Sequence, residues 1–125
     1  MITPRTALVT GGNRGIGKSI AEELIAQGYR VAVTARTGQG PAGALTVIAD
    51  VTDGASLDRA LAEVEQALGP IEILVANAGI TRDTLLMRMT DADFEQVLDT
   101  NLTGAFRVVQ RCIKSMIKAK YGRVI

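Results

Sequence analysis

The fold is decided by one stretch near the N-terminus, residues 6–17, which reads TALVTGGNRGIG. Its first four residues are small or apolar and predict a short buried strand, and the glycines that follow predict a tight turn. Beyond the turn, Ile16, Ile20 and Leu24 recur at helical spacing until Gly28, which marks the end of a helix. The order of strand, glycine turn and helix predicts the beginning of a βαβ unit.

The same alternation continues along the rest of the chain. We expect further strands at residues 31–35, 45–49 and 71–76, and the beginning of a fifth at 123–125. We expect one helix from Ser56 to Gly69-Pro70 and another from the Thr90-x-x-Asp93 capping signal towards Tyr121. The strand segments are apolar without alternation, which is typical of a parallel sheet covered by helices on both faces. The sequence therefore predicts the α/β class with a doubly wound parallel sheet, the Rossmann fold.

The composition excludes several classes of function. The net charge is +1, from 14 basic and 13 acidic side chains, so no strong field favours nucleic acid or a membrane surface as a partner. The sequence has no apolar run of about 18 residues and no N-terminal signal core, and we expect a cytoplasmic protein. The sequence has no histidine, which excludes most zinc sites and Ser-His-Asp catalysis. It has a single cysteine, Cys112, which excludes an internal disulfide.

The glycine turn is suited to a dinucleotide. Glycines let the backbone approach a pyrophosphate, and the N-terminus of the following helix stabilises its charge. The spacing departs from G-x-G-x-x-G and resembles the T-G-x-x-x-G-x-G form of the short-chain dehydrogenase/reductase family, a resemblance that covers essentially the whole chain. The cofactor-binding residues expected here are Thr10, Gly11, Asn13, Arg14, Gly15, Ile16 and Gly17. An ordinary turn is the alternative.

The length of the chain bears on its domain organisation. With 125 residues and 47% hydrophobic content, the chain suffices for one core and is too short for two ordinary domains. The final run, residues 123–125, would be a half-length strand. We therefore expect residues 1–125 to be a single dinucleotide-binding domain, truncated at the start of its fifth strand and so incomplete at the C-terminal end.

The end of the second expected strand bears on the choice of cofactor. An acidic residue there would accept hydrogen bonds from a free ribose diol, and the sequence has Thr34-Ala35-Arg36 instead. Arg36 and Arg14 can both bring positive charge and forked donors to a 2′-phosphate, so we predict NADPH as the cofactor. The alternative is that both arginines are solvated surface residues.

Two further stretches resemble the family's cofactor site. Asp50-Val51 resembles the pair that contacts the adenine, although Asp50 and Asp53 can also begin the next helix, for which Asp53 is the better cap. Asn77-Ala78-Gly79 resembles the family's N-A-G signature, whose asparagine ties the central strands together while its small neighbours leave room for the nucleotide. Taken alone, this tripeptide is only a turn.

One residue of the family's Asn-Ser-Tyr-Lys catalytic set is present, Asn101. Asparagine is a mediocre helix residue, and in the family it accompanies a local helix distortion and an ordered water in a proton relay. The alternative is a surface asparagine on a helix. The serine cannot be placed, and neither Tyr29 nor Tyr121 is followed by a lysine four residues later. We therefore expect this chain alone to be inactive.

Residues 80–89, ITRDTLLMRM, narrow the resemblance to the bacterial 3-oxoacyl-[acyl-carrier-protein] reductases, and residues 9–17 and 101–108 are similar to their actinobacterial forms. The resemblance implies that the parent enzyme is a homotetramer that uses NADPH to reduce 3-oxoacyl-[acyl-carrier-protein] to the 3-hydroxyacyl product in fatty acid synthesis. The alternatives are a short-chain reductase of another ketone or aldehyde and a non-catalytic dinucleotide-binding fragment. For the Leu/Met run, core packing is the alternative to substrate contact.

Basic residues recur at helical spacing after Asp99: Arg107, Arg111, Lys114 and Lys118, with Lys120 nearby. They predict one basic face, which could receive an acidic acyl carrier protein, and the resemblance places a basic docking residue at Lys120. The alternative is a solvated face. Cys112, on the same helix, is expected to be buried and unreactive.

Overall fold

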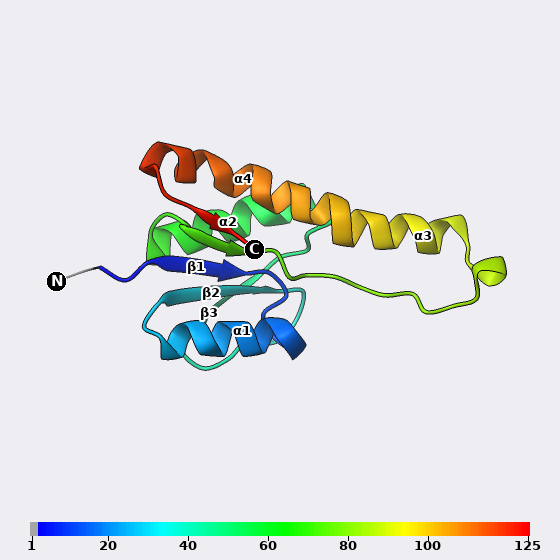
Figure 1. Ribbon diagram of the computed structural model, residues 1–125, viewed down its shortest axis with the longest axis horizontal. Coiled ribbons are helices and arrows are strands. Elements are labelled where there is room, and N and C mark those ends of the chain that lie inside the picture. Colours follow the sequence, from blue (N-terminus) through cyan, green and yellow to red (C-terminus); the bar gives the residue numbers. More distant parts are fainter. Residues whose placement is uncertain (1–2) are drawn as a thin grey trace.

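The chain forms one parallel sheet of five strands with helices on both faces, in a computed structural model that describes residues 3–125 (Figure 1). The strands are β1 (Thr6–Val9), β2 (Arg30–Ala35), β3 (Leu45–Ile48), β4 (Ile73–Val75) and β5 (Arg123–Val124), in the spatial order β3-β2-β1-β4-β5. All four pairings between neighbouring strands are parallel. The predicted doubly wound α/β fold is confirmed.

The α-helices are α1 (Gly15–Ala26), α2 (Gly54–Leu68), α3 (Asp91–Leu98) and α4 (Gly104–Ala119). Asp53 caps α2 by accepting hydrogen bonds from the amides of Ala55 and Ser56, as its sequence position predicts. Thr90 and Asp93 form the predicted capping box of α3. Within residues 3–125, no helix is long and apolar enough to cross a membrane.

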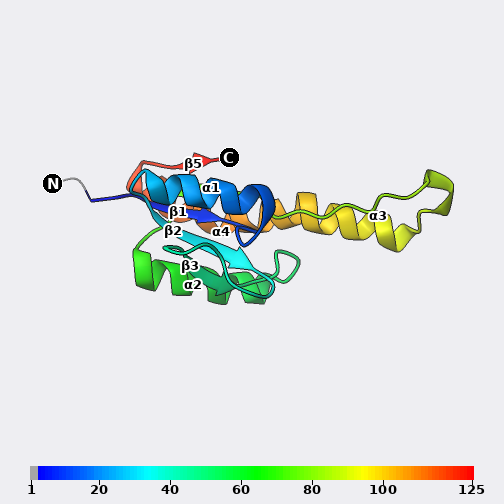
Figure 2. The same ribbon diagram turned by 90° about the horizontal axis from the view of Figure 1, so that it is seen from below.

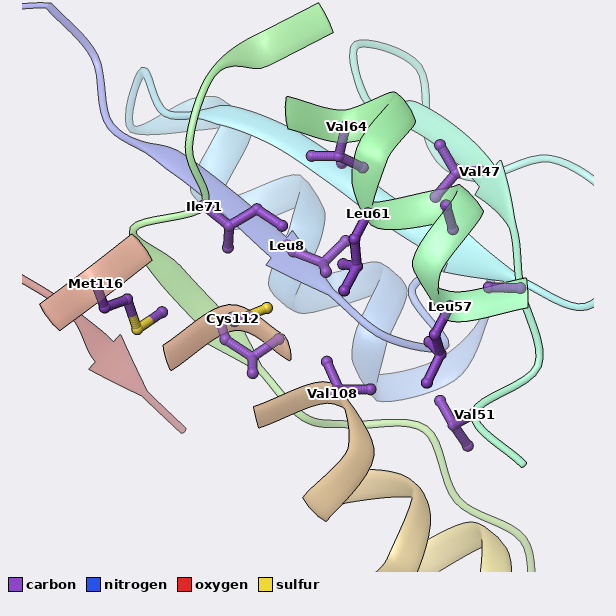
Figure 3. Packing of buried hydrophobic residues seen from close by; sticks show 14 residues of the cluster. Leu8, Val47, Val51, Leu57, Leu61, Val64, Ile71, Val108, Cys112 and Met116 are labelled. Atoms are coloured by element: carbon purple, nitrogen blue, oxygen red, sulfur yellow. The ribbon is translucent and has the colours of Figure 1, made fainter. Parts of the chain in front are cut away.

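The helices cover the two faces of the sheet unequally. In Figure 2, α1 lies on one side of β1 and α2 on the other. The apolar residues of α1 pack on Ala7, Val9, Val31 and Val33, which point to that face. The opposite face holds the larger cluster, where Val108, Cys112 and Met116 of α4 lie beside the α2 leucines around Leu8 (Figure 3). Alternate residues of β1 thus belong to different clusters, as the two-residue period of a strand requires.

The helix predicted from Thr90 towards Tyr121 is interrupted. A π-helical turn, Asp99–Thr103, separates α3 from α4, and α4 ends at Ala119 because Lys120 adopts a left-handed conformation with φ 56°. Before α3 the chain is extended apart from a short 3₁₀ turn, Leu86–Arg88, and this arm projects beyond the sheet (Figure 1). Leu86 and Met87 are 86% and 87% exposed, so core packing is the wrong interpretation for them in this structure.

Candidate functional site

A cleft of about 870 Å³ lies at the carboxyl edge of the sheet. After β1 the chain enters α1 on one face, whereas α2 and α4, before and after β4 in sequence, lie on the other, which opens a crevice between the two strands. The lining comprises the glycine turn, the ends of β2 and β3, the turn after β4, and one side of α3. It includes eleven predicted cofactor residues: Gly11, Asn13, Arg14, Gly15, Ile16, Arg36, Asp50, Val51, Asn77, Ala78 and Gly79.

The other two predicted residues, Thr10 and Gly17, lie beneath the cleft and are buried. A Cβ on Gly17 would overlap the side-chain amide of Asn77 and would lie 2.5 Å from the carbonyl oxygen of Gly11. Residue 17 must therefore be glycine for α1 to begin this close to the turn. Thr10 and Gly17 shape the site from below and do not line it.

The glycine turn leaves the start of α1 open. Gly11 and Gly15 have φ of 64° and 59°, in the left-handed region that favours glycine, and a Cβ on Gly15 would meet no atom within 4 Å. Arg14 occupies the N-cap position, but no side chain in the described part of the chain caps the helix. The first amides of α1 therefore face the cleft without a capping acceptor, which suits a phosphate group.

Asn77 fixes the turn after β4 to the glycine turn. Its Nδ2 donates to the carbonyl oxygens of Thr10 and Gly11, at 3.1 and 3.2 Å. In return, the hydroxyl oxygen of Thr10 accepts from the amides of Asn77 and Ala78, each at 3.0 Å. These four bonds hold the ends of β1 and β4 together, so Asn77 does more than form a turn.

A residue that the sequence analysis missed is Thr34 of β2. Its hydroxyl oxygen accepts from the Gly11 amide at 3.1 Å, and its carbonyl oxygen accepts from the Gly12 amide at 3.1 Å. Thr34 is only 2% exposed, so both bonds are sheltered from water. The signal was a lone hydroxyl residue in an otherwise apolar strand, since a buried polar side chain requires a partner.

Arg14, in the glycine turn, and Arg36, after β2, both line the cleft. Both are exposed, and neither forms an ion pair with any of the residues described. They also line a smaller adjoining hollow of about 570 Å³ together with Arg82. The geometry therefore supplies unpaired positive charge at the rim, where the sequence analysis expected a 2′-phosphate.

Asp50 points back to its own loop. Its Oδ1 accepts from the hydroxyl and the amide of Thr52, at 2.7 and 2.9 Å. The Thr52 hydroxyl is the main cause that lowers the pKa of Asp50 below its ordinary value, and the Thr52 amide is second. Burial opposes them, and Arg36 and Arg107 make smaller lowering contributions. Asp50 is therefore an ionised acceptor in the cleft, while Asp53 caps α2.

Asn101 lies in the π-helical turn, Asp99–Thr103. Its Oδ1 accepts from the Ile80 amide at 2.8 Å, and its Nδ2 donates to the Ile80 carbonyl at 2.9 Å. Both polar atoms of the side chain thus bond the backbone that follows the N-A-G turn, which a merely solvated asparagine would not do. The distorted helix that the resemblance implied is present at this residue.

The expected basic face is smaller than its sequence spacing suggested. Arg107 pairs with Asp99 and Arg111 pairs with Asp58, both at 2.7 Å. Their side chains are long enough to fold back on the protein, so these two arginines are not free for a partner. Lys114, Lys118 and Lys120 are exposed.

Cys112 is buried in the core beneath α4. Burial, with a further contribution from Glu65, raises the pKa of its thiol to about 12, so the reactive thiolate is not populated near neutral pH. Among the described residues no cluster of three or more histidine, cysteine or acidic side chains could hold a metal ion. The chemistry of this chain is therefore concentrated at the cleft.

Comparison with known proteins agrees with this architecture. The chain is 54% identical over 121 residues to the 3-oxoacyl-[acyl-carrier-protein] reductase MabA of Mycobacterium tuberculosis, an alignment that covers 97% of this chain and 49% of that protein. It is 41% identical over 129 aligned residues to the 3-oxoacyl-[acyl-carrier-protein] reductase FabG of Escherichia coli, which covers 97% of this chain and 53% of that protein. The chain thus spans about half the length of the curated relatives it matches. The sequence profile of the short chain dehydrogenases matches residues 5–125, and the chain belongs to that family.

Proposed function

We propose that the cleft binds NADPH and that the full-length protein reduces the 3-oxo group of an acyl chain carried on acyl carrier protein. The observation that carries the cofactor assignment is the uncapped, glycine-lined start of α1 with the unpaired Arg14 and Arg36 at its rim. The substrate assignment is supported by relatives that are named 3-oxoacyl-[acyl-carrier-protein] reductases over nearly the whole chain.

Different residues of the cleft bind different parts of the cofactor. The free amides of the first turn of α1 bind the pyrophosphate, and the forked guanidinium groups of Arg14 and Arg36 bind the 2′-phosphate. Asp50 and Val51 form the wall for the adenine, where the ionised carboxylate of Asp50 accepts hydrogen bonds from an exocyclic amine. Bound NADPH supplies the hydride.

Asn101 is the one member of the catalytic set that these 125 residues contain. It holds the backbone of Ile80 at the edge of the cleft, and in the reaction it orients a water that relays a proton. Reduction of the ketone also needs a proton donor at the carbonyl oxygen. The activity is therefore proposed for the full-length protein.

The carrier protein is the expected partner of the exposed lysines on and after α4. Lys114, Lys118 and Lys120 supply the positive charge that an acidic carrier protein requires.

The same helix exposes Phe106, Ile113 and Ile117, at 59%, 38% and 69%. An apolar surface of this kind is typical of a subunit interface, which supports assembly into a homotetramer.

Cofactor choice is tested by calorimetric titration of the full-length protein with NADPH and NADH. Arg36→Asp is expected to weaken NADPH binding roughly tenfold or more, because a charge-assisted hydrogen bond is lost and a repulsive charge is added, and to affect NADH less. Arg59→Asp is the control, since Arg59 is exposed on α2 and lies outside the cleft. An unchanged preference in Arg36→Asp would overturn the assignment.

The reaction is tested by following NADPH absorbance in the presence of a 3-oxoacyl thioester. We expect NADPH to be consumed, and consumption to be faster when the acyl chain is carried on acyl carrier protein. Binding of NADPH without any consumption would leave the cofactor site in place and overturn the proposed substrate.

A further inference from the structure

Arg107 lies at the junction between two walls of the cleft. From α4, its Nη1 donates to the carbonyl oxygens of Val51 and Asp99, at 3.0 and 3.4 Å, and its Nη2 bonds Asp99 Oδ1 at 2.7 Å. Val51 follows β3, Asp99 opens the π-helical turn, and both line the cleft. A single guanidinium therefore joins the proposed adenine wall to the turn that carries Asn101.

The backbone at this junction is packed without slack. A Cβ on Gly104, the first residue of α4, would lie 2.7 Å from Cγ2 of Val51 and 3.2 Å from the carbonyl oxygen of Asp99. Val51 is 6% exposed and Gly104 is buried, so neither can move toward solvent without opening the core. A displacement of Val51 is therefore passed directly to the start of α4 and to the turn before it.

Arg111, one turn further along α4, offers a close structural match that lacks this connection. Its ion pair with Asp58 has the same length as that of Arg107 with Asp99, 2.7 Å, and the two arginine side chains are 26% and 24% exposed. Arg111 ties α4 to Asp58 of α2 and to the carbonyl oxygen of Arg107, at 3.1 Å, but it does not bond Val51 or Asp99 and does not line the cleft. The two residues thus have ion pairs of the same length and similar exposure, but only Arg107 bonds the two walls of the cleft.

We propose that Arg107 is a positioning residue that couples occupancy of the adenine end of the cleft to the geometry of the π-helical turn around Asn101. The inference rests on the proposed cofactor site. A nucleotide that contacts Asp50 and Val51 restrains their loop, and the planar fork of Arg107 transmits the restraint because its donors have fixed relative directions. Asp99 is then held, and with it the turn from which Asn101 binds Ile80.

Hydrogen exchange followed by mass spectrometry tests this coupling in the full-length protein. The probe is adenosine 2′,5′-bisphosphate, which carries the adenine and the 2′-phosphate but no nicotinamide, so it cannot touch Asn101 as a substrate or hydride donor would. In the wild type, we expect the probe to slow exchange in residues 48–53 and, about fivefold or more, in residues 98–104. Arg107→Met should keep the first effect and lose the second.

Arg111→Met is the matched control and should keep both effects. Arg107→Lys is a second variant, for the case in which methionine destabilises α4. A single ammonium keeps the charge but cannot bond Val51 and Asp99 in the fixed directions of a guanidinium. Arg107→Lys should therefore also lose most of the protection at residues 98–104. Full protection there in both Arg107 variants, or its equal loss in Arg111→Met, would overturn the coupling. If the probe protects neither segment in the wild type, the proposed cofactor site itself is wrong.

Discussion

Gly17→Ala tests the close packing beneath the glycine turn. The new Cβ would overlap the Asn77 amide and press on the Gly11 carbonyl oxygen, and because the latter is backbone, α1 or the turn must shift. Overpacking of this kind costs about 1–3 kcal/mol. The two hydrogen bonds donated by Asn77 to Thr10 and Gly11 contribute about 0.5–1.5 kcal/mol each and are weakened by the shift.

The opposing gain is small, because alanine is favoured over glycine inside a helix by about 1 kcal/mol. Destabilisation therefore dominates, and we expect the free energy of unfolding to fall by about 1–5 kcal/mol. Urea denaturation of the full-length protein measures it as a lower midpoint. Ser19→Ala, on the exposed side of α1, is the control and should change stability by less than about 0.5 kcal/mol. A Gly17→Ala protein as stable as the wild type would refute the close approach of α1 to Asn77.

Substitutions at three further positions have distinct expected outcomes. Thr34→Val leaves the part-buried amide of Gly11 without its acceptor and should lower the free energy of unfolding by about 1–3 kcal/mol in urea denaturation, whereas Thr34→Ser should restore most of that loss. Because the pKa of Asp50 is lowered on folding, its bonds to Thr52 stabilise the fold fully above the unfolded carboxyl pKa, near 3.8. This contribution is lost as the pH falls through the pKa of the folded state. In acid titrations the stability of Asp50→Asn should therefore fall less steeply below about pH 4 than that of the wild type. Lys120→Glu should raise the KM for substrate bound to acyl carrier protein and leave the KM for a small thioester nearly unchanged. An equal rise in both KM values would contradict a docking role.

The fold and the glycine turn follow from local sequence patterns. The order of apolar strand, glycine turn and helical period at residues 6–28 predicts β1, α1 and the turn between them, because each depends on neighbours in sequence. The Asp53 cap and the Thr90/Asp93 capping box are equally local. Binding of NADPH by the cleft residues stays a prediction, with which their positions agree.

Features that depend on distant partners were not predictable from spacing. Arg107 recurs at helical spacing with Arg111 and Lys114, which suggested one free basic face. Its guanidinium turns inward because Val51, 56 residues earlier, presents a carbonyl oxygen there. The π-helical turn is similar. The capping signal at Thr90-x-x-Asp93 predicts one helix towards Tyr121, and the extra residue of the turn lies where Asn101 bonds the backbone of Ile80, 21 residues away.

The polar groups around the cleft fall into two sets with different consequences. The floor of the site consists of Thr10, Thr34 and Asn77, whose side chains hydrogen-bond one another's backbone or the glycine turn. These bonds fix the shape of the site before any ligand binds. Arg14 and Arg36 have no such partners among the residues described. The rigid floor loses little conformational entropy on binding, whereas each free arginine at the rim is ordered at a cost of about 0.5–1.5 kcal/mol. Substitutions in the floor should therefore lower stability and affinity together, whereas substitutions at the rim should lower affinity alone.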